Sequence, residues 1–576
     1  MEGCQAGLVD CGAPSTLLGD ACAAYASPYP SLEGSGTLLW SGVSIAVLMA
    51  FCIGGNDSAN SWATTVGSGA LPLRHALLLG GMGEWLGATL LGQGVSNTIQ
   101  KGVSHTDDPA CWGCGFCDSR MSVYAVGMLG ALIGAAVFLL AATFGKMPVS
   151  TTHAIVGGVI GMTLAGTSGS CLAWDWHGLG GIIASWVISP VLSGVIAAAV
   201  YVLTDKLAVR SRSPVRRTIL ALPILYALTT FIMVSLTIRK SKPTRNLPLG
   251  IQLAIATALA LLAFGVVQLL VVPRVRRSVT QRFPGAMSGS GPNAVVTTVS
   301  DAPTTATSAG PAGSPVTSAQ RVSAAEGVVE PVPVVEDAST SNGARSAGGV
   351  EMTEVDLSEN RAPGGGKGGV EESGSDLKIV RFGGKEPSTG RGPRNVAPRP
   401  PAEEAAVFVF RYLLVFVAFL ESFAHGANDT ANATSAFAAV WNAYTVGLHA
   451  CSNIETPWWI MSAAGLCVAL GVNLMGHRVI QTIGEDLTAI DYHVGFAIEF
   501  ASTLTVMIAT VIGGLPLSTT HCQVGAVVFT GFIISGRKGV DLRLFGKIAL
   551  TWVLTLPLAG GLAALLTAIF RAAIQL

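Results

Sequence analysis

The sequence predicts an all-α polytopic membrane protein, and three observations favour this fold class. Hydrophobic residues make up 50% of the 576 residues and charged residues only 12%, which excludes an ordinary soluble protein. Apolar stretches recur along the chain, and a helix needs about 20 such residues to cross a bilayer. Two polar motifs each occur twice in the same order, which indicates an internal duplication. The formal net charge is zero, so no nucleic-acid partner is indicated.

The membrane elements are predicted from apolar stretches on either side of a long polar segment. Those before it are residues 38–53, 75–93, 123–144, 154–165, 179–203, 219–236 and 249–272. Those after it are residues 407–424, 458–475, 494–512, 524–534 and 544–570. The first stretch of each set is expected to end where a polar motif begins.

Composition divides the chain into four segments. Residues 1–36 form an N-terminal tail, predicted to be external, and residues 37–272 form a membrane half with the first repeat. Residues 273–405 are rich in Gly, Ser, Pro, Ala and Glu and lack an apolar period, which predicts a disordered cytoplasmic loop. Residues 406–576 form the second membrane half, with the second repeat.

The first repeated motif is Gly54-Gly-Asn-Asp-Ser-Ala-Asn60, which recurs as Gly426-Ala-Asn-Asp-Thr-Ala-Asn432. A carboxylate at membrane depth is costly unless it is paired or bound to a cation. Asp57 and Asp429 are therefore predicted to bind a small cation such as sodium through hard oxygen ligands. The amides expected to assist them are Asn56, Asn60, Asn428 and Asn432. The alternative is that these residues only cap neighbouring helices.

The second repeated motif is Pro148-Val-Ser-Thr-Thr-His153, which recurs as Pro516-Leu-Ser-Thr-Thr-His521. Proline followed by Ser or Thr predicts the start of a helix. Hydroxyls and free N–H groups at the positive end of a helix can bind an anion. The candidate anion-binding residues are Ser150, Thr151, Thr152, Ser518, Thr519 and Thr520. Simple helix capping is the alternative, and the two histidines are expected to pack or hydrogen-bond.

The two kinds of motif together predict a coupled site. An anion beside two carboxylates is repelled by them, and neither motif contains a Lys or Arg to offset this. We therefore expect the anion to bind together with cations, which is symport. Glu84 and Glu499 also lie in apolar segments and are candidate functional carboxylates, with hydrogen bonding between helices as the alternative.

Basic residues and cysteines predict the orientation. The basic segments 206–217 and 274–277 are expected to be cytoplasmic, although the basic segment 239–245 between them points to the opposite side. This orientation places the N-terminus outside, and disulfides form in such an oxidising environment. The cysteines then expected outside are Cys4, Cys11, Cys22, Cys111, Cys114, Cys117, Cys171 and Cys451. Their pairing is not predicted, and zinc binding by the cluster at 111–117 is the alternative.

The four motifs, taken in order, resemble those of the inorganic phosphate transporter family, which contains sodium- and proton-coupled phosphate symporters. That family has Gly-Ala-Asn-Asp-x-Ala-Asn and then Pro-x-Ser-x-Thr-His in both halves, and Gly55 stands where Ala is usual. Glu84 and Glu499 look like its acidic positions. The resemblance implies about 12 membrane elements in two inverted-topology repeats with re-entrant helical hairpins. It also implies phosphate as substrate, both termini outside and the large loop in the cytoplasm.

The predicted function is therefore secondary active symport of inorganic phosphate with sodium, with protons as the alternative coupling ion. No enzymatic activity and no bound cofactor are expected, because the sequence has no phosphate-cradling Gly-rich motif and no catalytic cluster. The expected location is the plasma membrane, and a homodimer is left open. The competing functions are transport of another oxyanion such as sulfate, and a phosphate sensor or receptor derived from a transporter.

Overall fold

The computed structural model describes residues 15–17, 20–22, 36–114, 119–241, 244–286, 399–446, 456–488, 490–510 and 516–575. Most of the segment 273–405, predicted to be a disordered loop, lies outside the described residues. So do Cys4, Cys11, Cys117 and Cys451.

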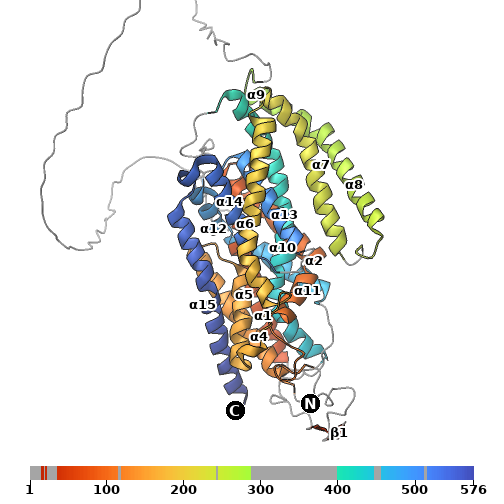
Figure 1. Ribbon diagram of the computed structural model, residues 1–576, viewed down its shortest axis with the longest axis vertical. Coiled ribbons are helices and arrows are strands. Elements are labelled where there is room, and N and C mark those ends of the chain that lie inside the picture. The colour runs from red at the N-terminus through yellow and green to blue at the C-terminus, as the bar shows by residue number, and fades with distance from the viewer. Residues whose placement is uncertain are drawn as a thin grey trace, which may run out of the picture. The chain divides into compact units, whose positions relative to one another are not determined.

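Almost all of the described chain is helical (Figure 1). The helices before the polar segment are α1 (Gly36–Gly67), α2 (Leu73–Leu91), α3 (Gln93–Gly102), α4 (Met121–Phe144), α5 (Thr151–Gly166), α6 (Leu179–Thr204), α7 (Pro214–Lys240), α8 (Leu249–Val266) and α9 (Val272–Arg282). Those after it are α10 (Pro401–Val446), α11 (Trp458–Met475), α12 (His477–Gln481), α13 (Tyr492–Ile508), α14 (Thr519–Ser535) and α15 (Leu542–Gln575). Short 3-10 and π-helical turns are η2 (Gly169–Cys171), η3 (Asp205–Val209), η4 (Val267–Val271), η5 (Thr482–Leu487) and η7 (Gly536–Gly539). Strands β1 (Ser15–Leu17) and β2 (Asp20–Cys22) pair antiparallel in the N-terminal tail.

The predicted apolar stretches lie mostly in helices, which makes the protein a mostly helical, multi-pass membrane protein. Within the described residues, eight helical segments are long and apolar enough to cross a membrane. They are Gly36–Gly67, Met121–Phe144, Leu179–Val209, Pro214–Lys240, Leu249–Arg282, Pro401–Thr445, Trp458–Met475 and Leu542–Ala573. The helices that begin at the two Ser-Thr-Thr motifs, α5 and α14, are shorter, with 16 and 17 residues.

Two predicted helix ends are wrong. The stretches 38–53 and 407–424 were expected to end at the Asn-Asp motifs, but α1 and α10 continue through these motifs without a break. A continuous helix satisfies its own backbone hydrogen bonds, which is the main requirement inside a membrane. The polar side chains of the motifs find partners on neighbouring helices, as described below, so they do not have to terminate the helix that carries them.

The boundaries of the polar segment are also displaced. The prediction that disorder begins at residue 273 is wrong, because α9 continues the chain to Arg282. This helix buries Val272, Val275 and Val279, which lie on one face at helical spacing. At the other boundary, α10 begins at Pro401 rather than at 406. Proline suits the first position of a helix, because its missing N–H is not needed there.

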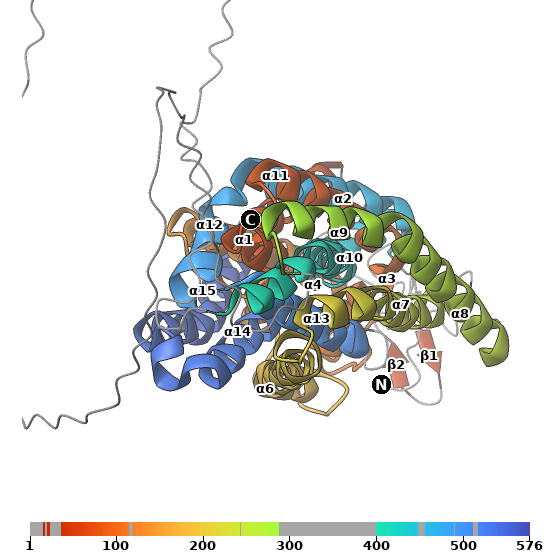
Figure 2. The same ribbon diagram turned by 90° about the horizontal axis from the view of Figure 1, so that it is seen from above.

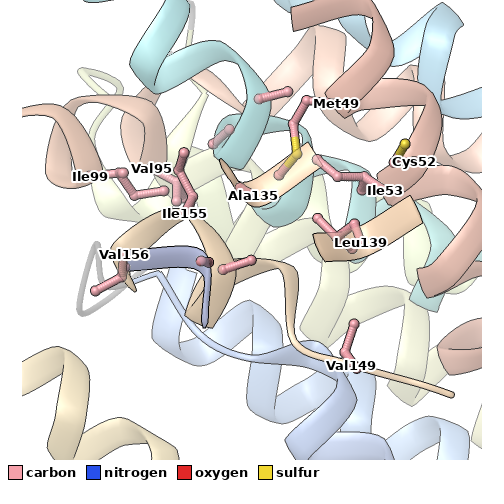
Figure 3. Close-up of a cluster of buried hydrophobic side chains, with 14 of the residues drawn as sticks. Met49, Cys52, Ile53, Val95, Ile99, Ala135, Leu139, Val149, Ile155 and Val156 are labelled. Atoms are coloured by element: carbon pink, nitrogen blue, oxygen red, sulfur yellow. The ribbon is translucent and has the colours of Figure 1, made fainter. Parts of the chain in front are cut away.

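The long helices α1 and α10 organise the packing around the site. Helix α10 packs against α1, α2, α4, α7 and α13, whereas α1 packs against α4, α10 and α11. Helices α5 and α14 pack against α15 and α6, respectively. Figure 3 shows the apolar cluster beside the first Ser-Thr-Thr motif. It contains Ile53 of α1, Leu139 of α4, Ile155 of α5 and, from the segment before α5, Val149. Helix α5 packs against α4, and the Val149 N–H just before α5 donates to Asn56 of α1.

Candidate functional site

The first Asn-Asp motif contacts the second Ser-Thr-Thr motif. The Nδ2 group of Asn60 in α1 donates to the hydroxyl oxygens of Thr520, at 3.0 Å, and Thr519, at 3.3 Å, at the start of α14. The hydroxyl of Thr520 also lies 3.5 Å from Oδ1 of Asp57. All four side chains are buried. Asn60 and Thr520, which are 460 positions apart in the chain, therefore form a direct polar contact.

The second Asn-Asp motif makes the matching contact with the first Ser-Thr-Thr motif. The Nδ2 group of Asn432 in α10 donates to the hydroxyl oxygens of Thr151, at 3.0 Å, and Thr152, at 3.3 Å. These hydroxyls lie 3.4 Å and 3.5 Å from Oδ1 of Asp429. Asp429 also accepts a shorter hydrogen bond of 2.7 Å from Thr519 of the other Ser-Thr-Thr motif. Asp429 thus contacts the starts of both α5 and α14.

The two Ser-Thr-Thr motifs also contact each other through the backbone. Thr152 donates to the carbonyl oxygen of Leu517 at 2.9 Å, and Thr520 donates to that of Val149 at 3.1 Å. The two motifs therefore lie in direct contact, and each threonine is bonded to the residue that precedes the serine of the other motif. Two positive helix ends face one buried region as a result.

The serines of these motifs act as helix caps in this structure. Ser150 Oγ accepts from the backbone N–H of His153 at 3.2 Å, and Ser518 Oγ accepts from that of His521 at 3.3 Å. The predicted helix starts are thus confirmed. Each capping hydroxyl still has its own proton to donate.

The first asparagine of each Asn-Asp motif supports the segment before a Ser-Thr-Thr motif. Asn56 donates to the Met147 carbonyl oxygen at 3.0 Å and accepts from the Val149 N–H at 3.0 Å. Asn428 donates to the carbonyl oxygen of Leu517 at 2.9 Å. Because both amide atoms of Asn56 are hydrogen-bonded, this residue fits a positioning role better than the cation-binding role predicted for it.

His425 is the functional candidate that sequence reasoning missed. Its Nε2 lies 2.7 Å from Oδ2 of Asp429 and 3.7 Å from Oδ2 of Asp57, and its Nδ1 lies 2.6 Å from Oε1 of Glu84. All of these side chains are buried. Neither motif contains a Lys or Arg, as noted from the sequence, but this imidazole places a basic group beside them. A signal was present, because His425 precedes the second motif where Ile53 precedes the first.

The acidic residues fall into two groups. Glu84, on α2, joins His425 and the two aspartates. Glu499, on α13, instead accepts hydrogen bonds from Thr64 and, at 3.0 Å, from Gln523. A further buried carboxylate, Glu421, was missed by sequence reasoning; it lies one turn before His425 and accepts from Ser502 at 2.6 Å.

The atoms around Asp57 and Asp429 suit a hard cation. Asp57 Oδ2, Asn60 Oδ1, Asn428 Oδ1 and Asn432 Oδ1 are buried and accept no hydrogen bond. One atom each from Asp57, His425 and Asp429 lie within 4.8 Å of one another. Unpartnered buried oxygens are costly, and a small cation would satisfy them. The residues present therefore fit a sodium ion carried as cargo.

The two motif histidines form a reciprocal arrangement behind the helix starts. The ring of His153 packs against that of Trp186 at a tilt of 52°, with centroids 4.0 Å apart, and its Nδ1 lies 3.3 Å from the carbonyl oxygen of Trp552. The ring of His521 packs against that of Trp552 at a tilt of 38°, with centroids 3.8 Å apart, and its Nδ1 lies 3.0 Å from the carbonyl oxygen of Trp186. These contacts agree with the packing and hydrogen-bonding role expected from the sequence.

Three of the cysteines expected outside, Cys111, Cys114 and Cys171, are disulfide-bonded. Cys111 forms a disulfide with Cys171, and Cys114 is also disulfide-bonded, so the zinc alternative for this cluster is wrong. Within the described residues, Cys52, Cys467 and Cys522 are free. They lie in the apolar helices α1, α11 and α14.

A membrane bundle in which buried carboxylates face two helix N-termini has the architecture of a secondary transporter. The chain belongs to the phosphate transporter family, whose model matches residues 53–563. It is 30% identical over 624 residues to the sodium-dependent phosphate transporter 1-A of Danio rerio, covering 89% of this chain and 92% of that protein. It is 31% identical to the sodium-dependent phosphate transporter 2 of Bos taurus, covering 87% and 92%.

A solved structure agrees with these relatives. The structure described as the sodium-dependent phosphate transporter matches with a TM-score of 0.66 and 26% identity, covering 93% of this chain and 99% of that one. The resemblance inferred from the four motifs is thus confirmed, as is the prediction of a transporter rather than an enzyme.

Proposed function

We propose that this protein is a symporter that carries inorganic phosphate together with sodium. The observation that carries the proposal is the crossed contact of the four motifs, in which Asn60 meets Thr520 and Asn432 meets Thr151. The names of the relatives, sodium-dependent phosphate transporters, contain the same two solutes, sodium and phosphate.

Phosphate would bind where the starts of α5 and α14 meet. The candidate residues are Ser150, Thr151, Thr152, Ser518, Thr519 and Thr520. Their hydroxyls and the first N–H groups of both helices provide donors, and both helix ends carry partial positive charge. Neutral donors of this kind recognise a tetrahedral oxyanion without a fixed salt bridge.

Sodium binding would make these donors available. In this structure the Thr519 hydroxyl donates to Asp429 at 2.7 Å, so carboxylate and phosphate compete for the same hydroxyl. A sodium ion on Asp429 satisfies the carboxylate and offsets its charge, after which the hydroxyl can turn to phosphate. Without that ion, unit charges about 4 Å apart repel by roughly 4 kcal/mol at a mid-range dielectric. Sodium and phosphate binding are therefore linked.

Proton coupling is a second candidate, and the position of His425 favours it. Three carboxylates, those of Asp57, Glu84 and Asp429, lie around this imidazole. A proton on His425 supplies the positive charge that sodium would otherwise supply. Histidine is the side chain whose ordinary pKa suits such a change near neutral pH.

The overall architecture that we propose is the one predicted from the sequence motifs and their family resemblance. It comprises about 12 membrane elements in two inverted-topology repeats, with re-entrant hairpins that carry the Ser-Thr-Thr turns. The proposed segments are 1–36 as an external tail, 37–272 and 406–576 as membrane halves, and 273–405 as a cytoplasmic loop, with the helical boundaries given above. The plasma membrane is the proposed location. Whether the protein forms a homodimer is left open.

Uptake of radiolabelled phosphate into proteoliposomes tests the proposed function. The purified full chain should concentrate phosphate when sodium is higher outside, and should do so much less with choline in place of sodium. A pH gradient applied without sodium separates proton coupling from sodium coupling. Uptake of sulfate in preference to phosphate would indicate another oxyanion carrier. Phosphate binding without uptake under either gradient would indicate a sensor.

A further inference from the structure

An arginine-rich helix lies across one end of the bundle. Figure 2 shows α9 lengthwise in the view from above, whereas α6 is seen end-on. The inner face of α9 buries Val272, Val275 and Val279 against the protein. Its outer face exposes Arg274, Arg276, Arg277 and Arg282. Since its valines already pack on the protein, α9 is held in place with its charged face turned outward.

A second basic segment lies beside α9. The turn η3, the start of α7 and the segment between them expose Lys206, Arg212, Arg216 and Arg217, and α7 packs against both η3 and α9. We call the following exposed cations the basic surface: Lys206, Arg212, Arg216, Arg217, Arg274, Arg276, Arg277 and Arg282. Asp205 is a nearby acid, and it is already paired with Arg210 at 2.8 Å. Six of the exposed cations make no ion pair with any residue that the structure describes: Lys206, Arg212, Arg216, Arg217, Arg276 and Arg277.

The fold separates this surface from the disulfide. Cys171 precedes α6 and η3 follows it, so the 26 residues of α6, with a length of about 39 Å at 1.5 Å per residue, lie between them. Disulfides mark the oxidising side of a membrane, and unpaired basic residues mark the cytoplasmic side. In the basic segment 239–245, which opposed this orientation in the sequence, Lys240 donates to the Thr510 carbonyl oxygen at 2.9 Å, whereas Arg239 and Arg245 are exposed.

We propose that the basic surface binds the headgroups of anionic phospholipids that carry phosphomonoester groups, in the cytoplasmic leaflet. Arginine side chains recognise phosphate oxygens with two parallel hydrogen bonds. Clustered basic residues directly after a membrane helix are the usual arrangement for this lipid class. We assign the bound phosphate group to a lipid and not to a free phosphate compound, because α9 continues the apolar helix α8 and so would lie at headgroup depth. The exposed leucines of the preceding α8 and η4, Leu261, Leu262 and Leu269, would contact the acyl chains.

The inference does not rest on the identity of the transported anion, and binding measurements test it directly. The probe is dioctanoyl phosphatidylinositol 4,5-bisphosphate added to the purified full chain in detergent, with bound lipid counted by native mass spectrometry. The triple variant R274Q, R276Q and R277Q should weaken binding by about ten-fold to a hundred-fold, since each basic residue contributes measurably. The charge-preserving R274K, R276K and R277K variant should retain most of the binding.

The control variant R537Q and K538Q removes exposed cations from η7, outside the basic surface. It should bind the probe like the unaltered protein; an equal loss in this control would overturn the assignment. Binding of soluble inositol trisphosphate as tightly as the lipid would overturn a lipid source. No binding of the probe at all would reject the site. Thermal unfolding of each variant checks that folding is intact.

Discussion

His425 and Glu84 belong to different helices, and their side chains meet in the membrane bundle, with Nδ1 2.6 Å from Oε1. The opposite ring nitrogen of His425 lies 2.7 Å from Asp429. The imidazole therefore bridges α2 to the second Asn-Asp motif. Since removing one member of a buried charged pair leaves the other uncompensated, these residues depend on one another.

Replacing His425 should change how transport responds to pH. His425→Gln keeps a polar side chain of similar length but cannot take up a proton. We expect lower phosphate uptake and a weaker response of uptake to pH between about pH 5 and 8, where histidine ordinarily titrates. The measurement is sodium-driven uptake across this range at equal protein density. An unaltered pH profile would remove the histidine from the coupling step.

Replacing either aspartate should weaken sodium dependence. Asp57→Asn and Asp429→Asn keep the shape of the side chain and remove one negative charge. We expect a higher half-saturating sodium concentration and, through linkage, a higher KM for phosphate. Uptake measured against sodium at fixed phosphate tests this. If both variants keep the unaltered sodium curve at normal surface expression, these carboxylates do not bind the coupling ion.

Replacing a Ser-Thr-Thr threonine should affect phosphate more than sodium. Thr519→Val removes the hydroxyl that donates to Asp429. A neutral hydrogen bond contributes about 1 kcal/mol, so the KM for phosphate should rise about five-fold. Thr257→Val on α8 is the matched control, because this exposed hydroxyl bonds only to its own helix at Leu253. Equal effects of the two substitutions would argue against a phosphate site at Thr519.

Gly426 should tolerate no side chain. A Cβ atom here would lie 2.0 Å from the backbone oxygen of Glu84, so glycine permits the close approach of α10 and α2. Gly426→Ala is expected to separate these helices and to reduce both expression and transport. Gly561→Ala on α15, with open space around the added atom, should be tolerated. The measurements are thermal unfolding of detergent-purified protein and uptake. Wild-type behaviour of Gly426→Ala would show that the helices can shift freely.

Breaking the disulfide should lower stability. Cys111 and Cys171 are 60 positions apart, and closing a loop of that length stabilises a fold by about 2–4 kcal/mol. Cys111→Ser combined with Cys171→Ser should therefore lower the thermal midpoint, as should reduction. Cys467→Ser, at a free cysteine, is the control. Mass spectrometry without reduction should find residues 111 and 171 in one linked peptide pair, and free thiols at both positions would contradict the structure.

The sequence by itself determined the class of protein and the parts of its site. Membrane-spanning helices need long apolar stretches, because their backbone must bond internally, and these stretches are visible in composition alone. The motifs at Asp57 and Asp429 and at Thr151 and Thr519 stood out because polar residues are costly inside apolar segments and because both motifs recur. Local chemistry also predicted the helix starts at Ser150 and Ser518, since a serine cap acts within three residues of itself.

Only the tertiary structure decided which motif meets which. That Asn60 bonds to Thr520 and Asn432 to Thr151 depends on helices packed from opposite ends of the chain. The bridge from His425 to Glu84 likewise depends on how closely α10 and α2 approach at Gly426. The motifs do not end α1 and α10, because partners on other helices satisfy their side chains. Such partners lie outside any local window, and packing alone sets their distance.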